Sequence, residues 1–371
     1  MIYFDNASTT PPMQALRDLE IPFGNPSSPH GLGILAERAI ADSRRQIADI
    51  LSCHPSDVAF TSGGTESNNL AIIGFALANR RNSVKILAQS WAHPSILEPL
   101  RYVDSEGLAE VEILSAPLSK SMASKLTAEE NLVLISQMNH ETGDIFDVAG
   151  LAADFRRKNP HITVHVDGVQ GFCKMPMDLY NVDMYSFSAH KIHGPAGVGG
   201  LMVRNTRLMP LLYGGGQERY YRSGTENVEG IIKMAYVIKN LHESQSAYHS
   251  QMCEIKSELS KIQDELPGVH VNCIGENTSP YILNLSFDGI KGEILVHLLS
   301  EKKIYASMGA ACRSRKKEVS SLEAMGFTKE RAQSAVRFSF SHMNTVAEAC
   351  QVREAVAASV AQLRRVLGYR D

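Results

Sequence analysis

Short apolar runs recur through the first two thirds of the chain, separated by polar turns and amphipathic stretches. Each run is continuously apolar rather than alternating, which is typical of strands buried on both faces of a parallel sheet. Helical periodicity at 33–51, 66–80 and 146–158 lies between some of the runs. We therefore expect an α/β fold with a mostly parallel seven-stranded sheet flanked by helices. The predicted strands cover residues 57–62, 84–89, 111–114, 131–136, 162–166, 182–187 and 198–203.

The pattern changes in the last third of the chain, where a polar helix is predicted over 242–266. The elements that follow predict a smaller α+β domain, because they mix strands with amphipathic helices. They are strands at 281–287 and 336–340 and helices at 292–301 and 345–367. A chain of 371 residues is too long for a single core. We expect a large domain at 13–245 and a small C-terminal domain at 246–371, joined by the N-terminal segment 1–12.

Composition narrows the functional classes. A net charge of −3 gives no electrostatic reason to expect direct binding of nucleic acid or of an anionic membrane. No apolar stretch approaches the roughly 20 residues that span a bilayer, and the N-terminus lacks the pattern of a signal peptide. The six cysteines are scattered without a Cys-x-x-Cys pair. Reduced thiols in a cytoplasm are therefore expected, with neither a disulfide framework nor a metal site.

One lysine stands where a predicted strand ends. Lys191 closes the stretch Ser186-Phe187-Ser188-Ala189-His190-Lys191 and precedes a glycine-proline turn. Ligands of parallel sheets bind beyond the carboxyl ends of the strands, so this position faces a cleft. The ammonium group either stays solvated there, or loses its proton and bonds covalently to a carbonyl cofactor. The residue alone leaves both interpretations open.

Two glycine-containing turns are candidates for binding anions. The stretch Thr61-Ser62-Gly63-Gly64-Thr65-Glu66 joins a predicted strand to a helix, so backbone N–H groups and the helix dipole can hold a phosphate. An ordinary strand-to-helix turn would read in the same way. A second glycine-rich, basic loop covers 214–219 and 222–225, and it predicts either another anion contact or a plain surface loop.

Three polar side chains follow other strands of the predicted sheet. Asp167 comes directly after the strand at 162–166, where a carboxylate either pairs with a cation such as a protonated pyridine nitrogen or caps the next turn. Gln170 follows and can donate a hydrogen bond to a ring oxygen. His93 follows the strand at 84–89 and can stack on an aromatic cofactor, although a lone histidine is more often a satisfied polar group.

Cys312 and Arg337 are the candidates in the last third of the chain. Small residues precede Cys312, and four cationic residues lie in the five positions after it. An exposed, electropositive loop lowers the pKa of a thiol and favours the nucleophilic thiolate. Arg337 lies within a strand pattern, where an arginine usually pairs with a carboxylate of the protein or of a substrate.

Taken together and in this order, these residues resemble the pyridoxal-phosphate-dependent cysteine desulfurases of the aminotransferase class V fold. The resemblance runs from residue 3 to about residue 365. The loop around Cys312 is similar to that of the longer-loop subgroup, which serves iron–sulfur assembly and tRNA thiolation. The stretches that carry the resemblance are Phe4-Asp5-Asn6-Ala7-Ser8-Thr9-Thr10-Pro11, Phe23-Gly24-Asn25-Pro26-Ser27-Ser28, and residues 61–69, 186–191 and 222–227.

The resemblance implies a homodimeric fold type I enzyme that binds pyridoxal 5′-phosphate. Lys191 would bond covalently to the cofactor and later move protons. Asp167 would pair with the pyridinium nitrogen, Gln170 would reach the ring hydroxyl, and His93 would stack on the ring. The implied cofactor-binding residues are Gly64, Thr65, His93, His140, Asp167, Gln170, Ser188, His190 and Lys191, with Thr225 arriving from a second subunit.

The same resemblance implies conversion of L-cysteine to L-alanine, with Lys191, Cys312 and His93 as catalytic residues. Cys312 would attack the substrate sulfur and keep it as a persulfide. An acceptor protein would then take the sulfur for iron–sulfur assembly or for thiolation of tRNA or a cofactor. The implied substrate-binding residues are Arg337, Asn139 and His140.

One departure from the family pattern keeps other functions open. The family usually has Asn-Asn-Glu-x-Gly where this chain has Asn139-His140-Glu141-Thr142-Gly143, so His140 replaces an asparagine that contacts cofactor and substrate. A second hypothesis is therefore a selenocysteine lyase, a sulfinate lyase or an aminotransferase of the same fold. A third is a non-catalytic homologue that acts as a scaffold.

Overall fold

The structure of the protein is a computed structural model that describes residues 1–115, 131–308 and 320–368. The chain divides into two compact units. The first comprises Pro11–Gln137 and Phe146–Glu243, and the second comprises Met1–Thr10, Met138–Ile145 and Ser244–Asp371. The division into domains at 13–245 and 246–371 stays a prediction.

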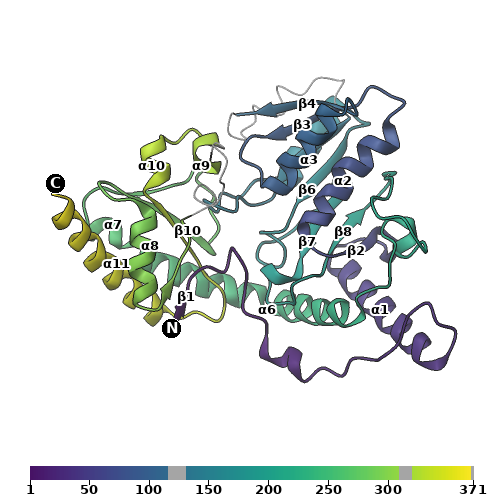
Figure 1. The fold of residues 1–371 in the computed structure, drawn as a ribbon, viewed down its shortest axis with the longest axis horizontal. Coiled ribbons are helices and arrows are strands. Elements are labelled where there is room, and N and C mark those ends of the chain that lie inside the picture. The colour runs from purple at the N-terminus through teal and green to yellow at the C-terminus, as the bar shows by residue number, and fades with distance from the viewer. Residues whose placement is uncertain (116–130, 309–319, 369–371) are drawn as a thin grey trace. The chain divides into compact units, whose positions relative to one another are not determined.

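The first unit is built on a seven-stranded sheet (Figure 1). Within this described sheet only β8 runs antiparallel to its neighbours, so the predicted mostly parallel α/β sheet is confirmed. The predicted strands agree with the observed ones to within two residues at each end. In spatial order the strands are β2 (Val58–Thr61), β8 (Gly199–Val203), β7 (Met184–Ser188), β6 (Thr163–Asp167), β5 (Leu132–Ser136), β3 (Lys85–Gln89) and β4 (Glu110–Leu114).

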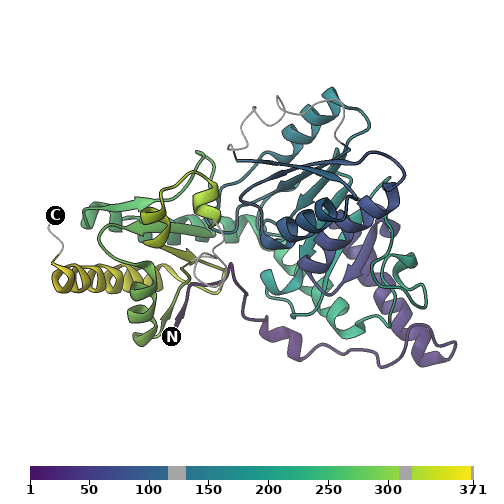
Figure 2. The ribbon, with the colours of Figure 1, turned by 45° about the horizontal axis from the view of Figure 1, so that its top comes forward.

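Helices cover this sheet. The helices α2 (Gly64–Asn79) and α3 (Pro94–Ser105) lie side by side (Figures 1 and 2), and their apolar faces form one core cluster with strand residues such as Leu132 and Leu201. Burying such side chains stabilises the fold by about 1.5–3 kcal/mol each. The other elements of the unit include η1 (Gln14–Arg17), α1 (Gly31–Ile50), η2 (Pro55–Asp57), α5 (Val148–Lys158), η3 (Ala189–Lys191) and η4 (Glu218–Tyr220).

The second unit mixes strands and helices, as predicted for the smaller α+β part. The strand β10 (Ile282–Phe287) lies between β12 (Ala335–Ser339) and β9 (Val269–Val271), and both pairings are antiparallel. A separate parallel pair joins β1 (Ile2–Tyr3) to β11 (Ile304–Tyr305). The helices are α7 (Ile262–Glu265), α8 (Gly292–Glu301), α9 (Ser321–Ala324), α10 (Lys329–Gln333) and α11 (Val346–Leu367).

One predicted helix has different bounds in the structure. The helix expected at 242–266 is the C-terminal part of the much longer α6 (Val228–Ser260), and the short α7 follows it. The sequence at 228–241 is apolar enough to read as part of the first unit's core, which hid the start of this helix. Among the helices that the structure describes, none has both the length and the apolar composition needed to cross a membrane.

Candidate functional site

The predicted cofactor residues of the first unit meet at one edge of its sheet. The strands β2, β3, β6 and β7 run in the same direction, so their carboxyl ends share that edge. Gly64 and Thr65 follow β2, and His93 follows β3. Asp167 is the last residue of β6 and pairs with Ser186 of β7. Ligands of parallel sheets bind beyond this edge.

The N-terminus of α2 is open at this edge. Gly63 is the N-cap residue with φ +150°, and no side chain caps the helix. The N–H groups of Gly64 and Thr65 donate no hydrogen bond to any residue that the structure describes. A β-carbon at Gly63 would lie 3.5 Å from Ser188 Oγ, and this hydroxyl is buried without a hydrogen-bond partner in the described chain. Free amides, a helix dipole and a free hydroxyl together fit a phosphate group.

The glycine at position 64 lets α2 approach the turn that follows Asp167. A β-carbon at Gly64 would come within 2.5 Å of Val169 Cγ2, so a larger residue would push the helix from the turn. The open N-terminus of α2 and the Asp167 carboxylate are therefore held in a fixed relation by direct packing.

The Asp167 carboxylate is anchored from two directions. Oδ1 accepts a hydrogen bond of 3.1 Å from Val169 N, and Oδ2 accepts one of 3.2 Å from Asn68 Nδ2. The carboxylate therefore does cap the following turn, which was one of the two sequence interpretations. It is also half-buried at the sheet edge. These donors fix the position of the carboxylate, which can pair there with a pyridinium nitrogen.

His93 is connected to this carboxylate through two other side chains. It is exposed and forms the N-cap of α3, where its Nδ1 accepts a hydrogen bond of 3.1 Å from Ser95 N. Ser95 Oγ lies 2.8 Å from His93 Nδ1 and accepts a hydrogen bond of 2.9 Å from Asn68 Nδ2. The predicted ring-stacking and ring-nitrogen residues thus belong to one hydrogen-bonded chain.

The lysine turn lies at the end of the neighbouring strand. Ser188 ends β7, and η3 then brings Lys191 to a half-buried position. Burial lowers the pKa of His190 to about 4, and the charges of Lys191 and Lys174 act in the same direction. His190 is therefore neutral at physiological pH. Gln170 is buried, and its Oε1 accepts a hydrogen bond of 3.4 Å from Lys174 Nζ.

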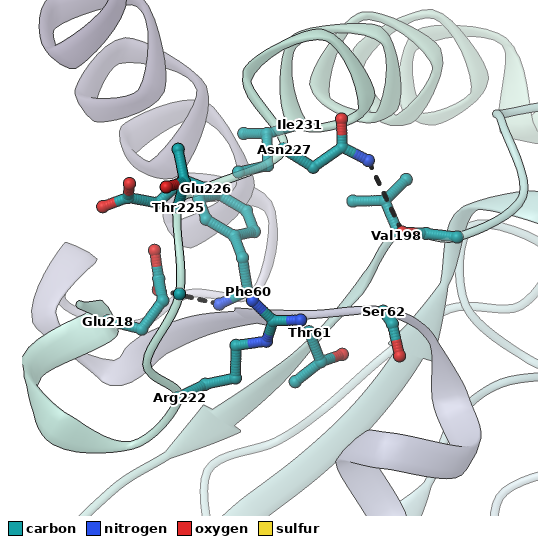
Figure 3. Close-up of a pocket in the computed structure, with 12 residues that line it drawn as sticks. Phe60, Thr61, Ser62, Val198, Glu218, Arg222, Thr225, Glu226, Asn227 and Ile231 are labelled. Atoms are coloured by element: carbon teal, nitrogen blue, oxygen red, sulfur yellow. Dashed lines mark hydrogen bonds between the residues drawn. The ribbon is translucent and has the colours of Figure 1, made fainter. Parts of the chain in front are cut away.

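The loop that carries Thr225 borders a pocket beside the end of β2 (Figure 3). Thr225 is exposed in the single chain, whereas Asn227 Nδ2 donates a hydrogen bond of 3.5 Å to Gly197 O. Arg222 Nε lies 3.1 Å from Glu66 Oε1, on the first turn of α2. The glycine-rich loop is therefore anchored next to the open N-terminus of α2.

The predicted substrate arginine belongs to the second unit and already has protein partners there. Arg337 Nη2 donates hydrogen bonds to Asp5 Oδ1 at 3.1 Å and to Ser8 Oγ at 2.8 Å. Its Nη1 donates to His140 O at 2.6 Å and lies 3.7 Å from Glu141 Oε1. The carboxylate that the sequence analysis expected beside Arg337 is thus protein in this structure, while Nε is buried without a partner among the described residues.

Asn139 and His140 lie in the same unit. Asn139 is buried, and its Oδ1 accepts hydrogen bonds from Glu141 N at 2.8 Å and Thr142 N at 2.9 Å. Its Nδ2 has no partner in the described chain. His140 Nε2 lies 3.7 Å from Glu141 Oε1. Cys312 lies outside the described residues.

Three residues of the hydrogen-bonded chain had no role in the sequence analysis, namely Asn68, Ser95 and His165. Asn68 and His165 are fully buried, and His165 Nε2 lies 3.1 Å from Asn68 Oδ1. A polar side chain on the core-facing side of a helix is a usable signal, because it must find a buried partner. The partners of Asn68 come from two separate segments, α3 and β6, so spacing along the chain could not identify them.

The α/β fold and the residues at this sheet edge are those expected for the aminotransferase class V fold. A comparison with known families agrees with this assignment. Residues 2–352 match the family model described as Aminotransferase class-V. The chain belongs to the aminotransferase class-V family.

Individual relatives have names that are more specific than the family description. The chain is 40% identical to the NifS/IcsS protein homolog of Lactobacillus delbrueckii subsp. bulgaricus, over 94% of this chain and 94% of that relative. It is 36% identical to the cysteine desulfurase IscS of Proteus mirabilis, over 98% and 93% of the two chains. A solved structure of a NifS-like protein superposes with a TM-score of 0.87 at 32% identity and covers 100% of both chains. The predicted resemblance is confirmed.

Proposed function

We propose that this protein is a pyridoxal-phosphate-dependent cysteine desulfurase, which converts L-cysteine to L-alanine and keeps the sulfur as a persulfide on Cys312. The observation that carries the proposal is the buried Ser188 hydroxyl without a partner in the described chain, next to the uncapped N-terminus of α2. Asp167 at the end of the adjacent strand complements it, because phosphate and pyridinium nitrogen need donors and an anion respectively.

The residues of the first unit would divide the cofactor between them. Gly64, Thr65, Ser188 and His190 would hold the phosphate, and Asp167 would hold the ring nitrogen. When bound, pyridoxal phosphate supplies an aldehyde for an amine and a protonated ring that withdraws electrons. Lys191 would be the amine at the end of β7, and it would move a proton at Nζ between steps.

Other residues would position the ring and the substrate. Gln170 would donate from Nε2 to the ring hydroxyl, since its Oε1 is already occupied by Lys174 Nζ. His93 would stack on the ring, and His140 would contact it. In the second unit, Asn139 Nδ2 and Arg337 Nε are buried donors without partners in the described chain, so both suit the substrate carboxylate.

The sulfur step balances within the protein and its substrate. The Cys312 thiolate attacks the substrate sulfur, the bond between that sulfur and Cβ breaks, and its electron pair ends as a C–H bond of alanine. The protein is left with an S–S bond on Cys312, which an acceptor protein then cleaves. The four cations that follow Cys312 favour the thiolate.

The test is to add L-cysteine to the purified protein with pyridoxal phosphate and to measure alanine and the mass of Cys312. We expect alanine release together with one added sulfur on Cys312. Cys312→Ser should keep the yellow cofactor and lose the reaction. The matched control is Cys253→Ser, which changes an exposed cysteine of α6 and should keep wild-type turnover. Unchanged turnover in Cys312→Ser would overturn the role of this thiol. Faster turnover of selenocysteine, a sulfinate or an amino-group acceptor would favour the other lyases or an aminotransferase.

We also propose a homodimer in which Thr225 serves the phosphate of the neighbouring subunit. Its exposure in the single chain and the anchoring of its loop support this. Lys191→Ala and Thr225→Ala should each be impaired, and mixing them should restore activity. One site of the mixed dimer then has both residues. No recovery after subunit exchange would place Thr225 in its own subunit's site.

The remaining proposals concern the domain boundaries, the cellular location and the acceptor protein. We propose that residues 13–245 form the cofactor domain and 246–371 the small domain, with the segment 1–12 joining them. The two compact units support a two-part organisation. A cytoplasmic setting is supported by the free thiols among the described cysteines. An unidentified sulfur-acceptor protein completes the proposal, for iron–sulfur assembly or thiolation.

A further inference from the structure

We infer that Asn68 is a positioning residue that couples Asp167 to His93 and holds the His93 imidazole in the tautomer with its hydrogen on Nε2. This inference rests on the proposed function, because it concerns two residues of the same cofactor site. It makes His93 Nε2 a hydrogen-bond donor, and not a general base, in the resting protein.

The orientation of the Asn68 amide follows from the Asp167 carboxylate beside it. An ionised carboxylate only accepts hydrogen bonds, so the Asn68 atom that lies 3.2 Å from Asp167 Oδ2 must be the nitrogen. The second hydrogen of that NH2 group points to Ser95 Oγ at 2.9 Å. The opposite orientation would place two oxygen atoms against each other in a buried site.

His165 fixes the other end of the amide. Its side chain is fully buried, and burial lowers its pKa to about 3, so the imidazole is neutral at physiological pH. Asn68 Oδ1 can only accept, so the hydrogen of this neutral ring must be on Nε2, 3.1 Å away. A buried acceptor without a donor would cost about 1–3 kcal/mol, which opposes rotation of the amide.

The direction of hydrogen-bond donation then continues from Asn68 through Ser95 to His93. Because Ser95 Oγ accepts from Asn68, its own hydrogen is available for His93 Nδ1 at 2.8 Å. The backbone N–H of Ser95 donates to the same nitrogen at 3.1 Å. Two donors face Nδ1, so Nδ1 cannot carry a hydrogen, and a neutral imidazole must carry it on Nε2.

This chain of hydrogen bonds has two consequences for the site. The hydrogen bond from Asn68 orients the Asp167 carboxylate, which would pair with the ring nitrogen. The same amide sets which nitrogen of His93 holds the proton that can be donated. A single buried side chain on α2 thus serves two residues from different strands, since His93 follows β3 and Asp167 ends β6.

The test reads the tautomer directly, in the full-length protein labelled with [15N]histidine, with and without pyridoxal phosphate. Long-range 15N–1H correlation shows which ring nitrogen carries the hydrogen, and His93→Gln identifies the signal. We expect the hydrogen on Nε2 in both states. Asn68→Asp should raise the fraction with hydrogen on Nδ1, because a carboxylate takes the Ser95 hydrogen that His93 now receives. Its kcat for L-cysteine should fall about 10- to 100-fold, by analogy with the loss found when the hydrogen-bond partners that orient metal-binding histidines are mutated.

Matched variants separate this role from a general loss of structure. Ser95→Ala removes one donor to Nδ1 and should raise the same fraction, whereas Ser95→Thr restores the hydroxyl and the wild-type spectrum. Ser105→Ala, at the exposed end of the same helix, should change nothing. Hydrogen on Nδ1 in the wild type, or wild-type spectra for both Asn68→Asp and Ser95→Ala, would overturn the inference. If Asn68→Asp does not fold, the spectrum of Ser95→Ala alone decides the question. Because the tautomer is read without turnover, absence of desulfurase activity would refute the proposed function alone.

Discussion

Arg44 and Glu218 share two hydrogen bonds of 2.7 Å each, from Nη1 to Oε2 and from Nη2 to Oε1. Only 15% of the Arg44 side chain and 3% of the Glu218 side chain are exposed. Glu218 Oε2 also accepts from Phe60 N at 2.8 Å (Figure 3). Glu218, Arg219 and Tyr220 have φ values of +47°, +54° and +68°, which are unfavourable for residues with side chains. The ion pair therefore holds a strained turn against β2.

Glu218→Ala should lower the free energy of unfolding by about 3–5 kcal/mol, because the Arg44 charge would remain largely buried without its carboxylate partner, with only the hydrogen bond of 2.6 Å from Nη1 to Val58 O left. Urea unfolding measures this. The control is Glu229→Ala, whose pair with Lys233 involves a carboxylate side chain that is 64% exposed and should contribute at most about 1 kcal/mol. Equal losses in the two variants would contradict the role of the buried pair.

Ser188→Ala should have opposite effects on stability and on cofactor affinity. Without cofactor the variant should be at least as stable as the wild type, because a buried hydroxyl with no partner in the described chain is removed. Affinity for pyridoxal phosphate should fall about 10- to 100-fold, through loss of a hydrogen bond to a charged group worth about 1.5–3 kcal/mol. Thermal unfolding and a fluorescence titration measure the two effects. Unchanged affinity would exclude this hydroxyl from the phosphate site.

Gly64→Ala should be destabilising by about 1–3 kcal/mol, since its β-carbon would collide with Val169 Cγ2. The displaced helix end should also bind pyridoxal phosphate more weakly. Gly31→Ala is the matched control at the first residue of α1, where a β-carbon meets no atom within 4 Å. There alanine should be neutral or stabilising by up to about 1 kcal/mol. Equal stability of the two variants would show that α2 can shift without cost.

The strands were predictable because each is a short, uninterrupted apolar run between turn-forming residues. Strand direction was not, since an apolar run reads the same in both senses, and the reversal of β8 became visible only through its pairing. The helix α3 was missed because Pro94 and Pro99 interrupt its pattern, although Pro94 stands at its start, where proline is well tolerated.

The site was predictable where strand ends carry polar residues, as at Asp167 and Lys191. The partners of those residues were not. Arg337 and Asp5 are separated by 332 positions, so the sequence left the nature of the partner carboxylate open. Asn68 stood within a recognised turn motif, yet its role depends on contacts with His165 and Ser95, which only the folded chain brings together.

Stability should also depend on the protonation of His165. The folded protein keeps this imidazole neutral, with a pKa lowered by burial from 6.5 to about 3, whereas the unfolded chain takes up the proton below about 6.5. The free energy of unfolding that the neutral imidazole contributes is therefore complete above pH 6.5. It is lost as the pH falls toward 3, with a slope of up to about 1.4 kcal/mol per pH unit. Urea unfolding of His165→Gln, which keeps an N–H donor, should show a shallower slope. His190 and His342, whose pKa values burial also lowers, remain in both proteins. Identical slopes would show that His165 is charged when folded.

The reversal of β8 has a mechanical consequence for Lys191. The chain leaves β7 at Ser188, makes the 3-10 turn η3, and after residues 192–198 returns as β8, hydrogen-bonded to the strand it has just left. The loop that carries this lysine is thus attached at both ends to neighbouring strands of the sheet, and a hydrogen bond of 3.1 Å from Ala189 N to Val198 O closes it. Because both ends of this loop are fixed in the sheet, we expect the movement that catalysis requires to come mainly from the lysine side chain and from the groups that approach it.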